Sequence, residues 1–183
     1  LWHIKYPINE KQFITIATTR PETMFGDSGV AVHPDDKRYK KLIGLECYLP
    51  LTDRKIKIIS DEYADPEKGS GAVKITPAHD FNDFEVGQRN KLEFINIFDK
   101  FAKLNENVPK KYRNLDKFEA RKLILNDLKS LNLLVKEEKQ LMVIPYGDRS
   151  GVVIEPWLTD QWFCDAKKLS LDPIKAVQTG DTK

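Results

Sequence analysis

Short apolar segments rich in β-branched residues dominate the pattern of this chain. Residues 13–18 (FITIAT) are of this kind, and residues 55–58 (KIKI) alternate between polar and apolar, as a half-buried strand does. Glycine and proline separate such runs from one another. Many short strands with turn residues between them predict a small barrel or a strongly curved mixed sheet. Further strands are expected at residues 71–76, 94–98, 141–146 and 152–155.

Three segments carry the signals of helices around this sheet. Residues 34–44 have a proline first, then acidic residues, then lysines and a final glycine, an order that suits the helix dipole. A second helix is expected to begin after Asp80 as N-cap and to end near Asn90. A third is expected after Asp116, which can form a capping box with Glu119. Its apolar stripe and C-terminal cap are predicted to be Ala120, Ile124, Leu128, Leu131 and Asn132.

Composition narrows the class of protein. With 183 residues, 40% apolar and 32% charged, the chain has the size and balance of one ordinary folded domain. Its net charge of +2 excludes a strongly basic nucleic-acid clamp, although a local patch can still contact phosphates. Cys47 and Cys164 form no CxxC pair, so neither a disulfide framework nor a zinc site is expected, and the cytoplasm is the default location.

Two other features concern the extent and the surface of the chain. No apolar run approaches the roughly 20 residues that a membrane span needs, and no signal peptide is recognisable. The first residue is Leu1, so the chain reads as a fragment of a longer protein. A basic stretch without periodicity lies between Lys100 and Arg113. It is either a solvated loop or a surface that touches a nucleic-acid backbone.

Two segments gather polar side chains where a strand ends. Residues 18–23 (TTRPET) follow a β-type run, and their hydroxyls, guanidinium and Glu22 carboxylate either form an ordinary turn or hold a ribose, an ester or a phosphate. Residues 74–83 (KITPAHDFND) join a strand to a helix. Strand alternation places Lys74 and Thr76 on one face, so both side chains are expected to point into the same mouth.

Competing interpretations apply to Asp83 and His79. Asp83 either completes a capping box with Asp80 or anchors a substrate ammonium group. His79 is a candidate general base, which would need a positioned water and a pKa near neutrality, or a structural residue beside a helix cap. As a metal ligand it would join both aspartates, as in metal-dependent phosphohydrolases. His3 and His33 lack ligand-type spacing, so no metal is predicted.

Long motifs then point to a known family. Residues 17–36 (ATTRPETMFGDSGVAVHPDD) resemble the threonine-rich editing motif shared by valyl-, isoleucyl- and leucyl-tRNA synthetases. Residues 69–87 (GSGAVKITPAHDFNDFEVG) resemble the second motif in its valyl form. The isoleucyl and leucyl enzymes typically show a Gly-His-Gly type of sequence where this chain has AHD at 78–80. Residues 114–122 and 145–163 also resemble the valyl enzymes, so the likeness covers nearly the whole chain.

The resemblance implies a mainly β fold, a small closed β-barrel with peripheral α-helices inserted into a catalytic domain. Residues 1–163 would form this editing domain, and residues 164–183 would lead back toward the catalytic domain. The implied reaction is hydrolysis of threonine from valine's tRNA, with no metal or cofactor for editing. ATP and magnesium would serve the separate catalytic domain. The implied partners are the tRNA acceptor end and the rest of the synthetase chain.

The resemblance also assigns roles to residues. Asp83 matches the aspartate that holds the substrate's α-amino group, and Lys74 and Thr76 are assigned to reading the threonine hydroxyl. The first motif faces the ester and the terminal adenosine. The predicted catalytic residues are Asp83, Thr18 and Thr19, and the predicted substrate-binding residues are Arg20, Glu22, Lys74, Thr76, His79 and Asp80.

The chain departs from the family pattern at one position, and three other functions compete with editing of threonine. The family usually has an aromatic residue where this chain has Lys68, so binding of the tRNA end should be weaker unless Lys68 contacts phosphate. The rivals are a non-catalytic module that docks the acceptor end, an isoleucyl-type domain that clears valine, and a metal-dependent phosphohydrolase.

Overall fold

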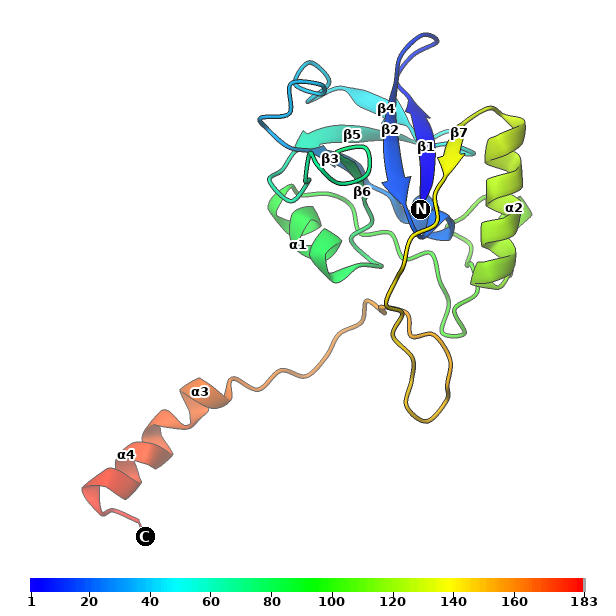
Figure 1. The fold of residues 1–183 in the computed structure, drawn as a ribbon. Coiled ribbons are helices and arrows are strands. Elements are labelled where there is room, and N and C mark those ends of the chain that lie inside the picture. The colour runs from blue at the N-terminus through cyan, green and yellow to red at the C-terminus, as the bar shows by residue number, and fades with distance from the viewer. Residues whose placement is uncertain (183) are drawn as a thin grey trace.

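The computed structural model describes residues 1–182, and its body is a pair of curved sheets with helices at the sides (Figure 1). No helix in this range has both the length and the apolar character needed to cross a membrane. The strands are β1 (Trp2–Pro7), β2 (Phe13–Thr18), β3 (Gly29–Val32), β4 (Glu46–Tyr48), β5 (Lys55–Ser60), β6 (Ala72–Ile75) and β7 (Leu134–Glu137). The helices are η1 (Pro21–Gly26), α1 (Phe81–Arg89), η2 (Lys110–Tyr112), α2 (Lys117–Ser130), α3 (Ala166–Leu169) and α4 (Leu171–Thr179).

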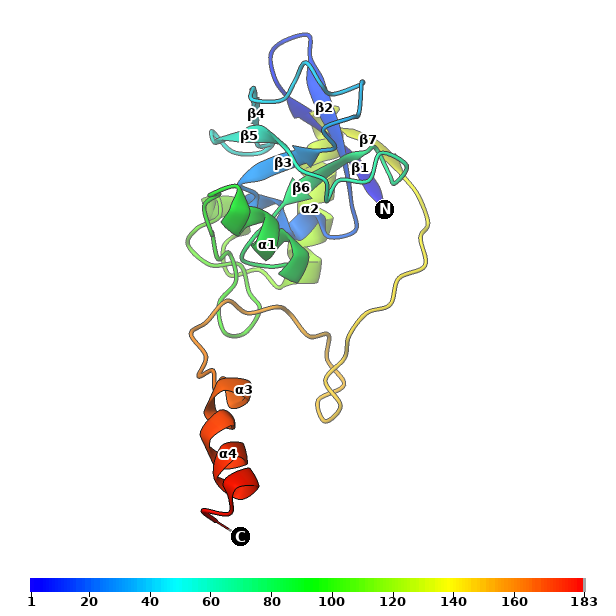
Figure 2. The same cartoon turned by 90° about the vertical axis from the view of Figure 1, so that its left-hand side faces the viewer.

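Hydrogen bonds divide the strands into two sheets. β1 pairs antiparallel with β2 and β7, which gives the order β2-β1-β7. The second sheet has the order β4-β5-β3-β6, in which β3 and β5 are parallel. Edge strands β2 and β6 lie beside each other, so the two sheets curve around one core (Figure 2).

The mainly β prediction is therefore confirmed, but the barrel is not continuous. No ladder of backbone hydrogen bonds joins β2 to β6 within the described part of the chain. The expected closed barrel is instead two sheets whose edges meet. Their junction becomes important below, because polar residues of both edges meet there.

The core lies between the two sheets and α2. Ile14 and Ile16 of β2 point inward by strand alternation, and Ile4 of β1 and Val32 of β3 are completely buried beside them. Each such side chain contributes roughly 1.5–3 kcal/mol relative to an exposed position. Burial of these strands fixes the positions of the loops that follow β2 and β6.

Two of the three predicted helices are confirmed. Asp80 is the N-cap of α1 and accepts hydrogen bonds from the backbone N–H groups of Asn82 and Asp83. Asp116 is the N-cap of α2 and accepts from the Phe118 N–H. Of the predicted stripe, Ala120, Ile124 and Leu128 are buried, while Leu131 is 57% exposed because it lies beyond the last turn. Asn132 adopts the left-handed conformation expected of the cap.

The predicted helix at residues 34–44 is wrong, because this segment forms consecutive turns. The Asp36 carboxylate accepts a hydrogen bond from the Arg38 N–H and pairs with the Arg38 guanidinium at 2.6 Å. Such local side-chain contacts compete with the helical backbone pattern. The dipole-compatible charge order was therefore not sufficient to form a helix.

Three predicted strands are also wrong. Residues 94–98 pack Ile97 and Phe98 into the core, but only an isolated bridge joins Phe98 to Leu104. Residues 141–146 and 152–155 lie in a largely exposed loop below the body, linked by one bridge between Tyr146 and Val153 (Figure 1). An apolar run becomes a strand only when another strand satisfies its backbone groups. The two strands predicted at residues 55–58 and 71–76 correspond to β5 and β6.

The C-terminal helices project away from the body (Figures 1 and 2). α3 and α4 follow one another end to end (Figure 1), and none of their residues is buried. The domain boundary predicted between residues 163 and 164 stays a prediction.

Replacing Ile124 by alanine tests the importance of α2 for the core. Ile124 is completely buried, so Ile124→Ala should lower the free energy of unfolding by about 2–5 kcal/mol. Leu131→Ala is the matched control at an exposed site of the same helix, with an expected change within roughly 0.5 kcal/mol. Urea unfolding followed by circular dichroism measures both, and equal losses would contradict the assigned packing.

Candidate active site

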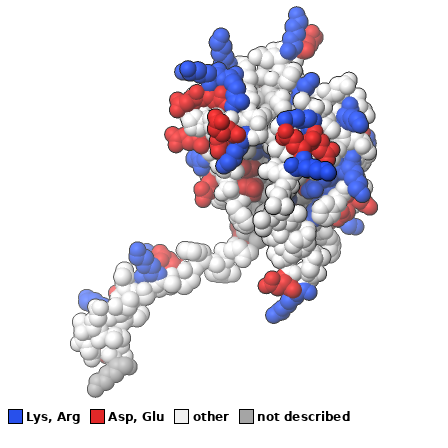
Figure 3. Space-filling view, viewed as in Figure 1, with Lys and Arg blue, Asp and Glu red and all other residues white. Residues whose placement is uncertain are grey.

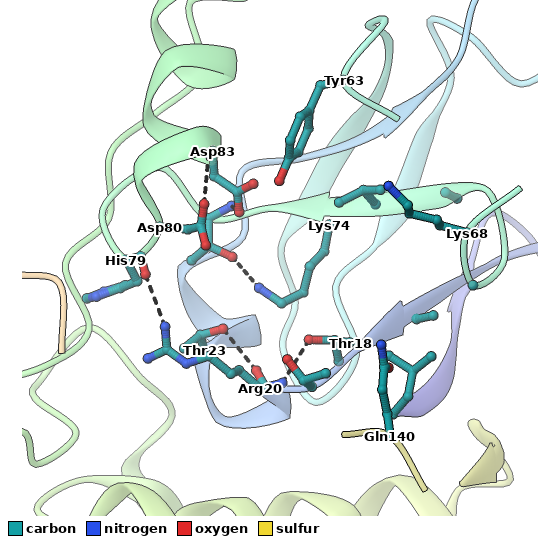
Figure 4. A pocket seen from close by; sticks show the side chains of 17 residues that line it. Thr18, Arg20, Thr23, Tyr63, Lys68, Lys74, His79, Asp80, Asp83 and Gln140 are labelled. Carbon is teal, nitrogen blue, oxygen red and sulfur yellow. Dashed lines mark hydrogen bonds between the residues drawn. The ribbon is translucent and has the colours of Figure 1, made fainter. Parts of the chain in front are cut away.

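A pocket of about 350 Å³ opens where the edge strands β2 and β6 meet (Figure 4). Its walls come from the end of β2, the η1 turn, β6, the start of α1 and the loop that carries Lys68 and Gly69. This volume lies in the range of small-molecule sites. The predicted site residues that line it are Thr18, Thr19, Arg20, Lys74, Thr76, His79, Asp80 and Asp83.

A buried polar cluster forms the floor of the pocket. The Lys74 ammonium donates to Asp27 Oδ1 at 3.0 Å and also to the Thr76 hydroxyl. Thr76 Oγ1 donates to Asp27 Oδ1 at 2.6 Å, and Tyr6 donates to Asp27 Oδ2 at 2.7 Å. The predicted alternation is confirmed, since Lys74 and Thr76 lie on one face. Burial raises the pKa of Asp27, while its contacts with Lys74, Thr76 and Tyr6 lower it.

Asp83 faces the pocket from the first turn of α1 (Figure 4). Its Oδ2 accepts a hydrogen bond from the Thr76 N–H at 2.8 Å. The capping-box interpretation is wrong, because this carboxylate binds the N–H of Thr76, directly after β6, and not the N–H of Asp80. Among residues 1–182 its second oxygen has no hydrogen-bond partner, so that oxygen is available to a ligand. Burial raises the pKa of Asp83 to about 6, so the side chain is mostly ionised at neutral pH.

His79 contributes its backbone to the pocket and its ring to the core. The ring Nε2 accepts a hydrogen bond from the Ile97 N–H at 2.9 Å, and the ring packs edge-on against Phe98. Burial, assisted by Arg20 and Lys74, lowers the pKa of His79 to about 3. The general-base interpretation is wrong, because the nitrogen that would take a proton is already used. Within residues 1–182, no three His, Cys, Asp or Glu side chains gather where they could bind a metal.

Arg20 is held in place at the end of β2. Its backbone N–H donates to the Thr18 hydroxyl at 3.0 Å, and its carbonyl accepts from the Thr23 hydroxyl at 2.9 Å. The guanidinium donates from Nη1 to the His79 carbonyl at 3.1 Å (Figure 4) and from Nη2 to Glu155. Arg20 therefore joins the loop after β2 to the loop before α1.

Glu22 does not line the pocket, so its predicted contact with substrate is corrected. Its side chain is completely buried and forms two hydrogen bonds with the Arg121 guanidinium of α2, both at 2.7 Å. A buried carboxylate needs such a partner to offset its desolvation. Glu22 thus attaches η1 to α2 and acts on the pocket only by fixing the position of η1.

The loop of residues 65–71 forms the rim above β2. Gly69 comes so close to β2 that a Cβ on it would lie 2.8 Å from the Ala17 Cβ, and its φ of +59° also favours glycine. The Lys68 side chain is 84% exposed and pairs with Asp65 at 3.2 Å. A cation therefore lies at the mouth of the pocket.

Comparison with known proteins identifies the family. The family model described as "Leucyl-tRNA synthetase, editing domain" matches residues 37–140, which is more than half of the chain. The chain belongs to the aminoacyl-tRNA synthetase editing-domain family. Valine--tRNA ligases also align with it: 61% identity over 100% of the chain for Pelagibacter ubique, 52% over 99% for Caulobacter vibrioides and 53% over 100% for Coxiella burnetii.

The relatives are much longer than this editing domain. The chain spans 20–22% of their length, so it corresponds to one part of each valine--tRNA ligase. The resemblance to the valyl form of the editing domain is confirmed by these alignments, which run across the whole chain.

Solved structures support the fold. The crystal structure of GlLeuRS-CP1 aligns with a TM-score of 0.60 and 12% identity, covering 76% of this chain and 99% of that one. Agrobacterium radiobacter K84 agnB2 LeuRS, in its ternary complex with tRNA and LeuAMS, aligns with a TM-score of 0.58 and 18% identity, covering 72% of this chain and 19% of that one. At these identities the likeness concerns the fold alone.

The structure adds residues that the sequence did not single out. Asp27 lies inside the first motif, yet only the fold brings its carboxylate to Lys74. One signal was available, because a lysine in a buried apolar strand requires a buried carboxylate. Nothing in the sequence said which of the acidic residues it was. Thr23, Tyr63 and Gln140 also line the pocket.

The surface of the editing domain carries mixed charges. On the face shown in Figure 3, basic and acidic side chains are interspersed over the body, in keeping with the net charge of +2. In the basic stretch, Lys111 pairs with Asp127 at 2.6 Å and Arg113 donates to the Val108 carbonyl. Part of this stretch therefore has structural contacts, and its contact with a nucleic-acid backbone stays a prediction.

The acidity of Asp83 is directly testable. Because its pKa in the folded protein is raised from 3.8 to about 6, ionising this group costs folding free energy, and the cost develops as the pH rises through that interval. Carbon-detected NMR of the side-chain carboxyl should show a midpoint near 6. Lys74→Met should raise that midpoint further, since Lys74 lowers the pKa of Asp83. A midpoint near 3.8 in the folded chain would contradict the described environment.

Proposed function

We propose that this editing domain hydrolyses the ester that joins threonine to the tRNA of valine, as part of a valine--tRNA ligase. The observation that carries the proposal is the buried Lys74–Thr76–Asp27 cluster facing the same pocket as Asp83. The alignment of this whole chain with one part of a valine--tRNA ligase supports it.

Such an enzyme needs a second site because threonine and valine have nearly the same shape. Valyl-tRNA synthetase is itself the known illustration of this limit, in which a pocket made for valine rejects threonine by only about 10². A polar pocket reverses the preference, because it can require the hydroxyl that valine lacks. Buried polar groups left without partners cost roughly 1–3 kcal/mol each.

The cluster on the pocket floor is suited to reading that hydroxyl. The Thr76 hydroxyl donates its hydrogen bond to Asp27. Its oxygen can therefore only accept hydrogen bonds from other groups. Lys74 uses two of its three N–H groups on Asp27 and Thr76. The third can donate to the threonine hydroxyl oxygen, and valine would leave this donor without a partner.

Asp83 and the first motif then position the ester. The free Asp83 oxygen receives the α-ammonium group, while Thr18, Thr19 and Arg20 face the ester and the terminal adenosine. A water molecule attacks the ester carbonyl without a covalent intermediate, and a vicinal ribose hydroxyl assists it. Rate enhancement comes chiefly from holding these groups in place. Asp80 and the His79 backbone shape the wall, and no metal or other cofactor takes part.

The proposed partners are the threonine-carrying acceptor end and the rest of the synthetase in the same chain. Leu141 and Trp162, in the segment of residues 139–165, are fully exposed. Such exposed apolar side chains support the proposal that the rest of the synthetase covers this segment. Cys47 and Cys164 are free, which suits the cytoplasm as the proposed location.

Deacylation by an Asp83→Asn variant tests the proposal. The amide oxygen can still accept from the Thr76 N–H, so the fold is kept while the charge that holds the ammonium is lost. Hydrogen bonds to charged groups contribute about 1.5–3 kcal/mol, so release of threonine from the tRNA of valine should fall about 10- to 100-fold. Wild-type protein should spare the valyl ester, and Asp35→Asn, at an exposed site, should behave like wild type.

Other outcomes would identify the rival functions. Tight tRNA binding without cleavage of either ester favours a docking module, and preferential cleavage of the valyl ester favours isoleucyl-type editing. Loss of activity on adding EDTA would point to a metal-dependent hydrolase.

A Thr76→Val variant tests how the hydroxyl is recognised. Removing the Thr76 hydroxyl should lower threonyl-tRNA deacylation roughly tenfold and reduce discrimination against the valyl ester. The control is Thr15→Val, the same change on β2, where the threonine forms no side-chain hydrogen bond within residues 1–182. Rates of both esters measure the effect, and undiminished discrimination would remove Thr76 from the specificity site.

A further inference from the structure

Glu155 is a shielded carboxylate in an otherwise exposed segment. Residues 139–165 lie mostly at the surface, but the Glu155 side chain is only 12% exposed. It forms ion pairs with Arg20 and, at 2.7 Å, with Lys117 at the start of α2. Lys117 itself is nearly buried, with 7% of its side chain exposed. After the exposed loop, the chain therefore returns to the body at Glu155.

Packing around this contact is loose. A cavity of about 220 Å³ lies between the start of α1, at Phe81 and Phe84, and the segment carrying Trp157 and Leu158. Trp157 and Leu158 remain 45% and 41% exposed. Apolar contacts fill this region incompletely, and the ion pairs of Glu155 join the segment to the body.

Glu155 belongs to a chain of alternating charges whose central member lines the pocket. Arg20 lies between Glu155 and Glu22, whose Oε1 is 3.6 Å from Arg20 Nε, and Glu22 is fixed by Arg121. Arg20 is the member of this chain that lines the pocket. Of the groups that bind its guanidinium, Glu22 and the His79 carbonyl belong to the two motifs, whereas Glu155 comes from a distant segment.

We propose that Glu155 is a positioning residue of the editing site, which orients the Arg20 guanidinium and makes the pocket complete only when residues 152–158 are docked. Without Glu155, the remaining carboxylate beside Arg20 is Glu22, which is already shared with Arg121. The guanidinium then turns toward Glu22 and away from the position in which it faces the ester. The activity readout of this inference rests on the proposed function.

Kinetics of the whole 183-residue chain test the inference. Glu155→Gln should lower kcat for threonyl-tRNA deacylation about tenfold with little change in KM, since a displaced positioning group mainly affects the reacting geometry. Glu155→Asp should restore part of the rate. Lys117→Met removes the other partner of Glu155 and a contact with the Val153 carbonyl but leaves the Arg20 pair, so it should lower Tm while kcat falls much less than in Glu155→Gln. Asp148→Asn, an exposed carboxylate in the same segment, should behave like wild type.

A double-mutant cycle separates positioning from a purely structural role. In an Arg20→Lys background, Glu155→Gln should change kcat by less than about twofold, because the group that it positions is gone. If Glu155 only holds the segment in place, the loss will be equal in both backgrounds and will follow Tm, as in Lys117→Met. Either that result or an unchanged rate in Glu155→Gln would overturn the inference.

An NMR measurement keeps this test independent of the proposed function. The resonance of Arg20 Nη2, whose protons face Glu155, should be resolved and slowly exchanging in the wild type and in Lys117→Met, and averaged or lost in Glu155→Gln. If wild-type protein deacylates nothing while this pattern is seen, the proposed function fails and the positioning role stands. If the resonance is the same in all three proteins, the positioning role fails whatever the activity.

Discussion

The buried contact between Lys74 and Asp27 is the interaction on which the pocket depends. Tyr6 of one sheet and Lys74 of the other both bind the Asp27 carboxylate, so a single buried charge connects the two sheets where backbone pairing does not. A buried ion pair adds little net stability, but removing one partner typically costs about 3–5 kcal/mol. The pair is best understood as a device that fixes the geometry of the floor, because it determines which way the Thr76 hydroxyl points.

The same burial sets the chemistry of the pocket. Desolvation raises the pKa of Asp83 to about 6, and Lys74 limits the rise, so the carboxylate stays largely ionised at neutral pH. Desolvation also keeps His79 neutral, with its Nε2 engaged by the Ile97 backbone. A site made of an ionised acid, an ammonium group and hydroxyls is suited to a substrate part that carries an ammonium group and a hydroxyl, as the proposed function requires.

Local sequence signals predicted those elements whose partners lie nearby in the chain. Asp80 and Asp116 cap α1 and α2 because a cap needs only the following turn, and β5 follows from its alternation. Residues 34–44 failed because Asp36 binds Arg38 instead of allowing a helix. Residues 141–146 have the composition of a strand but no strand beside them, and β-structure cannot form without a partner.

The sequence by itself determined the family, the mainly β class and eight of the residues that line the pocket, because long motifs keep chemically necessary side chains at fixed spacings. Lys74 and Thr76 share a face through strand alternation, which is a local property. Only the tertiary structure decided that Asp27 lies beneath them, that Glu22 turns away to Arg121, and that Glu155 reaches Arg20 across 135 positions of the chain. Each of these is a carboxylate that burial forces to find a cation, and the sequence shows the charges without showing which of them the folded chain brings together.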